Sequence, residues 1–271
     1  MKVILKSIFS FFKDAGPLHA SSIAYFFLMA FVPFCLFLIT IFGYFLGENK
    51  EFYEFFSARL LRFFPAATSE ISRGLSALIM YRKIGHLTFI IYAYFSYLLY
   101  LSLERAIHVV FQEKVRRPRL ISIIMPFFIV TLIAVLITIS FTATSVIQVL
   151  KLMILDSTGL QIGIITGFLI QFVIPVFFVF ITATILYTLL PVKKTTLRNA
   201  SWGGCFTAIF LEAARHFFTL YAVNAASQFG AIYGSLSSMA IFLLWIFYAA
   251  CIFLIGAEIV KNLGDAERKP A

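Results

Sequence analysis

Long apolar stretches, separated by short polar or basic segments, dominate the pattern of this chain. An α-helix of about 20 apolar residues is long enough to cross the hydrocarbon core of a bilayer. Six stretches reach or approach this length, at residues 23–47, 87–103, 120–150, 160–190, 200–223 and 235–260. The pattern therefore predicts an all-α polytopic membrane protein, with one integral membrane domain over residues 1–271 and six transmembrane helices.

Two shorter segments have the pattern of helices that lie on a membrane surface. Within residues 1–13, Lys2, Lys6 and Lys13 are interspersed with apolar residues, so we expect a short interfacial helix whose lysines meet anionic lipid. In the first long loop, residues 51–64 (EFYEFFSARLLRFF) place charged and aromatic side chains on separate helical faces. A surface helix is the expectation there as well.

The composition agrees with a lipid environment. Of the 271 residues 62% are hydrophobic and only 13% are charged, whereas soluble domains have about a quarter of their residues charged. A soluble enzyme, a secreted disulfide scaffold and a disordered tail are therefore excluded. Cys35, Cys205 and Cys251 all lie in apolar stretches and lack the spacing of a metal site.

The net charge of +10 is explained by membrane orientation. With six spans and a cytoplasmic N-terminus, fourteen Lys and Arg residues fall in the inside segments and seven in the outside segments. Both termini are thus predicted to be cytoplasmic. The expected partners are membrane lipids, with anionic headgroups at the cytoplasmic basic loops, and we expect no nucleic acid.

The fifth predicted span carries ionisable residues that lipid does not tolerate cheaply. Glu212, Arg215 and His216 occur at i, i+3 and i+4, which puts them on one helical face. Such groups face a partner or a water-filled cavity. This face is either a polar seam between helices or the lining of a transport pathway, and it offers too few ligands for a metal site.

A second ionisable pair ends the sixth predicted span. Glu258 is followed by Lys261 at i+3, so we interpret the two as an ion pair at the helix end or as a gate. Glu104, Arg105 and His108, at the end of the second span, are predicted to form a solvated face at headgroup level.

Prolines and motifs complete the residue-level picture. Pro33 and Pro175 each remove a backbone hydrogen bond within a predicted span and are expected to kink it. No P-loop, GxSxG, HExxH or GxGxxG after a strand occurs. We therefore expect no catalytic residues, cofactor or metal, and any transport would be passive, ion-coupled or driven by a separate partner.

Seven short motifs occur in order along nearly the whole chain. They are ASSIAYFFLMAFVP (20–33), LYTLLP (186–191), WGG (202–204), FTLY (218–221), IYGSL (232–236), LLWIFY (243–248) and LIGAE (254–258). In these motifs the chain resembles the YihY or virulence factor BrkB family of bacterial inner-membrane proteins, once labelled ribonuclease BN. The motif positions matched are Tyr25, Pro33, Tyr187, Pro191, Tyr221, Tyr233, Gly234, Trp245 and Glu258.

The resemblance implies a six-helix inner-membrane protein and a link to envelope lipids, but it assigns no role to any residue. We add Tyr25, Tyr221 and Tyr233 to the candidate polar pathway. The leading hypothesis is a transporter or flippase for a lipid or amphiphilic anion. A membrane scaffold without transport is the alternative, a ribonuclease is third, and a homo-oligomer is compatible with either membrane role.

Overall fold

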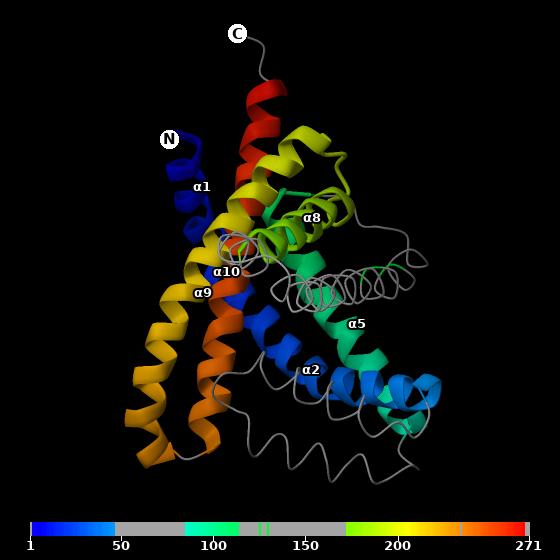
Figure 1. Cartoon of the computed structure of the whole chain (residues 1–271). Coiled ribbons are helices and arrows are strands. Elements are labelled where there is room, and N and C mark those ends of the chain that lie inside the picture. Colours follow the sequence, from blue (N-terminus) through cyan, green and yellow to red (C-terminus); the bar gives the residue numbers. More distant parts are fainter. Residues whose placement is uncertain are drawn as a thin grey trace, which may run out of the picture. The chain divides into compact units, whose positions relative to one another are not determined.

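A computed structural model describes residues 2–46, 85–113, 172–233 and 235–268, together with Met125 and Ile129. All regular elements within these residues are helical (Figure 1). They are α1 (Lys2–Lys13), α2 (Gly16–Leu46), α5 (Gly85–Val110), α8 (Ile174–Leu189), α9 (Leu197–Tyr233) and α10 (Ser235–Arg268). The all-α prediction is confirmed for this part of the chain.

The predicted spans coincide with helices wherever the structure describes them. Spans 23–47, 87–103, 200–223 and 235–260 fall on α2, α5, α9 and α10, and the end of span 160–190 falls on α8. Span 120–150, apart from the helical Met125 and Ile129, and the surface segment 51–64 lie outside the described residues. The helix predicted within residues 1–13 is present as α1.

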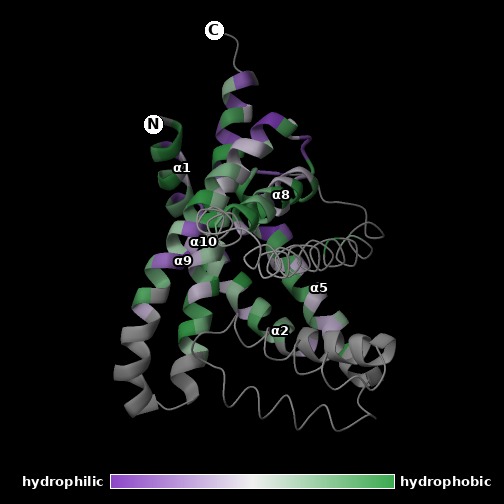
Figure 2. Cartoon of the chain, in the orientation of Figure 1, coloured by the Kyte–Doolittle hydropathy of each residue, from purple (hydrophilic) through white to green (hydrophobic). Residues whose placement is uncertain are grey.

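One described segment, Met239–Glu267, is long and apolar enough by itself to cross a membrane. Shorter apolar helices are Gly16–Phe31 and Ile174–Leu189. Figure 2 shows hydrophilic residues at the start of α9 and at the end of α10, and a further hydrophilic stretch part-way along α9. That the chain crosses the membrane six times remains a prediction.

The described helices divide into two compact units, each assembled from separated stretches of sequence. Unit 1 contains α1, the end of α5, α8, α9 up to Ala213, and α10 from Cys251 onward. Unit 2 contains α2 from Leu18, α5 up to Ser102, the rest of α9, and α10 up to Ala250. Each unit therefore has its own core built from several helices.

Helix α9 is longer than the sequence pattern predicts. The polar residues from 224 onward suggest an outside loop, yet α9 continues to Tyr233 and α10 begins at Ser235. Its 37 residues correspond to about 55 Å of helix, more than a bilayer core requires. The segment NAASQFGAIY contains three alanines and no proline, so its sequence is compatible with a continued α-helix.

The two predicted kink prolines occupy different positions in their helices. Pro33 lies inside α2, where it removes one intrahelical hydrogen bond, as predicted. Pro175 lies in the first turn of α8, directly after a π-helical turn at Phe172 and Val173. A proline in the first turn removes no hydrogen bond of α8 itself, so any kink there belongs to the junction with the preceding turn.

Two helix ends adopt left-handed backbone at residues other than glycine. Ala15, between α1 and α2, has φ of 54°, and Gln112, after α5, has φ of 50°. At the end of α5, the Glu113 amide donates to the His108 carbonyl at 3.0 Å and the Gln112 amide to Val109 at 3.1 Å. These two bonds form a Schellman motif that satisfies the last carbonyls of α5.

The core of unit 2 combines small residues with aromatic pairs. Ala20 and Ala24 of α2 are buried, and the Ser102 hydroxyl of α5 donates to the Ser22 hydroxyl of α2 at 2.9 Å. The rings of Phe218 and Trp245 have centroids 5.1 Å apart, which joins α9 to α10. Small residues let helix backbones approach closely, as expected for packing in a membrane.

Candidate functional site

In unit 1, Tyr187 of α8 joins α9 and α10. Its side chain is fully buried, and its ring stacks on that of Phe253 with centroids 4.8 Å apart. The Tyr187 hydroxyl donates to the Phe253 carbonyl at 2.6 Å and lies 2.7 Å from Oγ1 of Thr207. A buried tyrosine hydroxyl with two partners fixes the register of all three helices.

Two glycines allow the backbones of α9 and α10 to meet beside this tyrosine. A Cβ on Gly203 would lie 2.8 Å from the Gly256 carbonyl oxygen and would overlap the Val260 side chain. A Cβ on Gly256 would overlap both Thr207 Oγ1 and the Tyr187 hydroxyl. The motifs around Tyr187, Gly203 and Gly256 therefore form one close-packed cluster, which we call the tyrosine–glycine cluster.

Glu258 carries a carboxylate in the interior of unit 1. Its exposed fraction is 0%, and neither carboxylate oxygen accepts a hydrogen bond from any residue that the structure describes. The Lys261 Nζ atom lies 3.6 Å from Glu258 Oε2 and 3.8 Å from Asp14 Oδ2. We call Asp14, Glu258 and Lys261 the buried charge cluster.

The predicted Glu258–Lys261 pair forms, but its expected place at a helix end is wrong. Helix α10 continues for ten residues beyond Glu258, to Arg268. The polar sequence after Lys261 suggests an end, whereas contacts with other parts of unit 1 extend the helix. The pair consequently lies within the helix rather than at its terminus.

The turn directly after α1 supplies the third member of the charge cluster, Asp14. Ser7 and Phe11 on α1 and Asp14 just after it are spaced at i, i+4 and i+7, and Ser7 and Phe11 are buried. The Asn262 side-chain amide donates to the Ser7 hydroxyl at 2.9 Å. Ser7 thus contacts Asn262 while Asp14 contacts Lys261, and α1 is held against the last part of α10.

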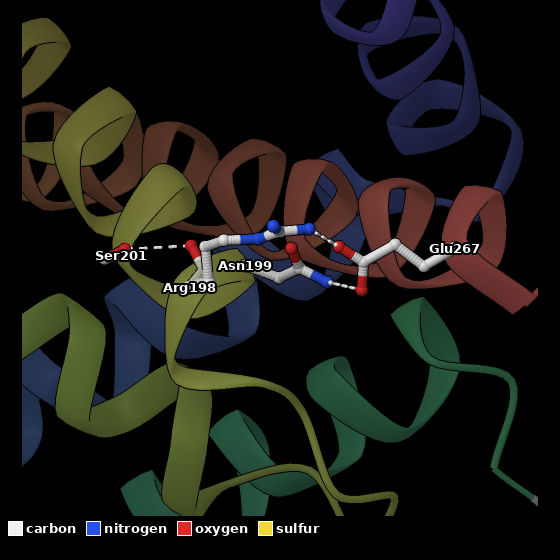
Figure 3. Close-up of polar contacts among 4 residues, drawn as sticks. All are labelled: Arg198, Asn199, Ser201 and Glu267. Carbon is white, nitrogen blue, oxygen red and sulfur yellow. Dashed lines mark hydrogen bonds and ion pairs between the residues drawn. The ribbon is translucent and has the colours of Figure 1, made fainter.

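Beyond the charge cluster, the first turn of α9 is tied to the end of α10 (Figure 3). Arg198 donates a hydrogen bond to one oxygen of Glu267, and the Asn199 amide donates to the other at 3.0 Å. Glu267 is exposed, unlike Glu258 on the same helix. Exposed pairs of this kind contribute little to stability because solvent screens them, so the contact serves mainly to orient the helix ends.

The end of α5 docks on the segment between α8 and α9. The backbone amide of Lys193 donates to Glu113 Oε1 at 2.7 Å, and His108 Nε2 lies 3.3 Å from Glu113 Oε2. Glu104 is buried as well. The prediction of a solvated face at residues 104–108 is therefore wrong for Glu104, because unit 1 covers this end of α5.

The family was identified by comparison with known proteins. The model of the family described as Virulence factor BrkB matches residues 8–270. This chain belongs to the Virulence factor BrkB family. The resemblance noted in the motifs is thereby confirmed, and the tyrosine–glycine cluster gives three of those BrkB motifs a common structural place.

Curated relatives of this BrkB-family chain are named UPF0761 membrane proteins. One from Haemophilus influenzae (strain 86-028NP) is 26% identical over 91% of this chain and 89% of the relative. One from Aliivibrio salmonicida (strain LFI1238) is 27% identical over 94% and 81%. One from Azotobacter vinelandii (strain DJ / ATCC BAA-1303) is 28% identical over 95%, but the match spans only 62% of that relative. No solved structure matches.

The remaining predicted pathway residues of this BrkB-family protein lie on α2 and α9. On α9, Glu212 is buried at 7% exposure, Arg215 is half-buried and His216 is exposed. Glu212 belongs to unit 1, and Arg215 and His216 belong to unit 2. Tyr25 and Tyr221 are exposed residues of unit 2, and Tyr233 is the last residue of α9. The pathway assignment stays a prediction.

Metal chemistry finds no support in the described ranges. No group of three or more His, Cys, Asp and Glu residues in them could hold a metal ion. Cys205 and Cys251 are free thiols on α9 and α10. The sequence did not predict the contact of Asp14 with Lys261 or that of Ser7 with Asn262, because only tertiary packing brings α1 to α10.

Proposed function

We propose that this BrkB-family membrane protein transports a lipid or amphiphilic anion across the bacterial inner membrane, or flips it between the leaflets. The observation that carries the proposal is the burial of Glu258. On insertion scales a charged residue near the centre of a membrane helix costs about 2.5–3.5 kcal/mol. A buried carboxylate without a hydrogen bond from the described residues is thus costly for a purely structural role.

The proposed substrate class follows from the combination of apolar and cationic surface. Arg215 and His216 lie on α9 beside strongly exposed apolar residues, Phe217 and Leu220. A guanidinium binds phosphate or carboxylate headgroups, while the apolar side chains suit acyl chains. An anionic amphiphile fits both properties better than a small soluble ion does.

The proposal is tested by lipid movement in proteoliposomes. Purified protein is reconstituted with fluorescent phosphatidylglycerol, and the fraction of probe that an external quencher reaches is followed with time. We expect wild-type protein to accelerate movement and Glu258→Gln to lose that acceleration. Glu267→Gln is the matched control, because it removes an exposed carboxylate from the same helix.

Two results would count against the proposal. Equal movement in wild-type and protein-free vesicles would exclude this class of phospholipid. Equal activity in Glu258→Gln and wild type would remove Glu258 from the pathway. Native mass spectrometry of minimally delipidated protein then tests for a retained amphiphile that Arg215→Ala loses.

A membrane scaffold is the second candidate, and the tyrosine–glycine cluster favours it. Gly203 and Gly256 lock α9 to α10, and Tyr187 adds α8, which is an arrangement suited to a rigid bundle. A scaffold predicts that Glu258→Gln lowers stability in detergent while no lipid flux is lost. A transporter predicts that Glu258→Gln loses lipid flux while its stability in detergent is kept. Both candidates assume a multi-pass inner-membrane protein without enzymatic activity.

A further inference from the structure

The buried charge cluster contains one more negative than positive group. Asp14 and Glu258 both lie within 4 Å of the single Lys261 ammonium. Among the described residues, these two charged groups act electrostatically on Glu258, Asp14 from the turn after α1 and Lys261 from its own helix α10. Two other described acids of unit 1 have different partners, Arg198 for Glu267 and His108 for Glu113. With both carboxylates ionised, the cluster therefore has a net charge of −1.

A net negative charge in the protein interior is unfavourable unless a cation compensates for it. Both oxygens of Glu258 are buried and accept no hydrogen bond from the described residues, so they are available for a proton. A metal ion instead would need several oxygen ligands around it, and the described residues offer no suitable group. One bound proton brings the cluster to neutrality.

The two carboxylates differ in their access to water. The Asp14 side chain is 20% exposed and that of Lys261 12% exposed, whereas the Glu258 side chain is 0% exposed. Asp14 is therefore the carboxylate of the cluster that water reaches more readily. Glu258, which has no exposed surface to dehydrate, is the carboxylate that can hold a proton while Asp14 keeps its contact with Lys261.

We propose that Glu258 is a proton-binding site of this protein and that Asp14 passes the proton between water and Glu258. Uptake forms one O–H bond on the Glu258 carboxylate, takes one proton from water, and changes the cluster charge from −1 to zero. Because Asp14 directly follows α1 and its amide donates to the Ser10 carbonyl of α1 at 2.8 Å, the protonation state is also linked to how α1 is held on α10. A role in driving transport rests on the proposed function, but the proton site itself does not.

The test is infrared spectroscopy of the full-length protein in lipid nanodiscs, titrated with acid and base. A protonated carboxylic acid has a C=O stretching band that a carboxylate lacks. We expect a titrating band in wild type that disappears in Glu258→Gln and is unchanged in Glu267→Gln. Asp14→Asn removes a negative neighbour, so the same band should titrate at lower pH in that variant.

Three outcomes would overturn the proton site. The first is a titrating band that survives in Glu258→Gln. The second is a midpoint in Asp14→Asn equal to that of wild type. The third is a band whose amplitude at constant pH depends on sodium concentration, which would assign the site to a metal cation. If Glu258→Gln does not fold, the shift in Asp14→Asn decides the proposal alone.

The spectroscopic test separates this inference from the transport proposal. A band that behaves as expected in protein without lipid-moving activity would retain the proton site and reject transport. Lipid movement without such a band would retain the transport proposal and reject the proton site. A pH gradient that accelerates lipid movement in wild type but not in Asp14→Asn would link the two.

Discussion

The hydroxyl of Tyr187 on α8 donates a hydrogen bond to the Phe253 carbonyl on α10 while the two rings stack. Because a tyrosine has a single hydroxyl proton, the contact with Thr207 on α9 must run the other way, with Thr207 donating to Tyr187. The hydroxyl of one residue thus uses both its donor and an acceptor position, and each bond reaches a different helix.

Replacement of Tyr187 by phenylalanine tests this relationship. The ring stacking on Phe253 remains, but the Phe253 carbonyl and the Thr207 hydroxyl lose a buried partner. We expect Tyr187→Phe to lower stability by about 1–3 kcal/mol, measured by thermal unfolding in detergent. Tyr248→Phe, at an exposed site on α10, is the control and should have little effect. Equal effects of the two changes would mean that the buried bonds contribute nothing.

A glycine beside Tyr187 gives a second prediction, by comparison with a glycine near the end of α10. Replacement by alanine should have opposite effects on stability at the two sites. Gly203→Ala places a methyl group against the Gly256 carbonyl and Val260, so we expect a loss of about 1–3 kcal/mol. Gly264→Ala, where the nearest atom would be Asn199 Nδ2 at 3.9 Å, should gain about 0.5–1 kcal/mol from reduced backbone entropy. Denaturation in mixed detergents measures the stability change of both variants. A change of the same sign in the two variants would contradict the close approach of α9 to α10 at Gly203.

The sequence predicted the helices and the pairs within a helix better than the contacts between helices. Hydrophobic length identified α2, α5, α9 and α10, and spacing alone predicted the Glu258–Lys261 pair. Both signals are local. The end of α9 was missed because its polar residues resemble a loop, whereas the helix continues to Tyr233.

The candidate site depends on contacts across long stretches of sequence. Asp14 and Lys261 are far apart in the chain, so no periodicity could place them together. The same holds for Tyr187 and Gly256, although both lie in family motifs. The polar stripe Glu212, Arg215 and His216 was predicted correctly as part of one helix, but its burial changes along that helix.

The end of α5 gives a third prediction, which concerns backbone conformation. Gln112 has φ of 50° in the Schellman motif, a region that L-residues other than glycine adopt at a cost. Gln112→Gly should therefore raise stability by about 1 kcal/mol. Gln112→Ala removes the same exposed side chain but keeps the cost, so it should give no gain in the same thermal assay. A gain in both variants would show that the side chain, and not the backbone, is responsible.

Glu113 provides a fourth prediction, about the segment that joins α8 to α9. Its carboxylate accepts the Lys193 amide proton at 2.7 Å, and the Lys193 side chain donates to the Phe111 carbonyl at 3.3 Å. We expect Glu113→Ala to speed hydrogen exchange at residues 191–196 by about tenfold or more, since a hydrogen bond to a charged group contributes about 1.5–3 kcal/mol. Mass spectrometry of deuterated peptides measures this. Glu267→Ala, which removes the contacts of Arg198 and Asn199 in the first turn of α9 and leaves Glu113 in place, is the control and should leave these amides protected.

The contact between α1 and α10 gives a fifth prediction, about the side of the membrane on which the two ends lie. Ser7 of α1 contacts Asn262, and Asp14, just after α1, contacts Lys261. Both contacts lie near the C-terminal end of α10, so α1 is held beside that end in unit 1 (Figure 1). Together with the excess of Lys and Arg in the predicted inside segments, this favours cytoplasmic positions for both.

Reporter fusions measure this directly. A green fluorescent protein that folds only in the cytoplasm should fluoresce when joined to either end, and periplasmic alkaline phosphatase should be inactive at both. Fluorescence at one end alone would contradict the α1–α10 contact, because a membrane would then separate Ser7 from Asn262. Activity of the phosphatase at both ends would keep the contact and reverse the predicted orientation.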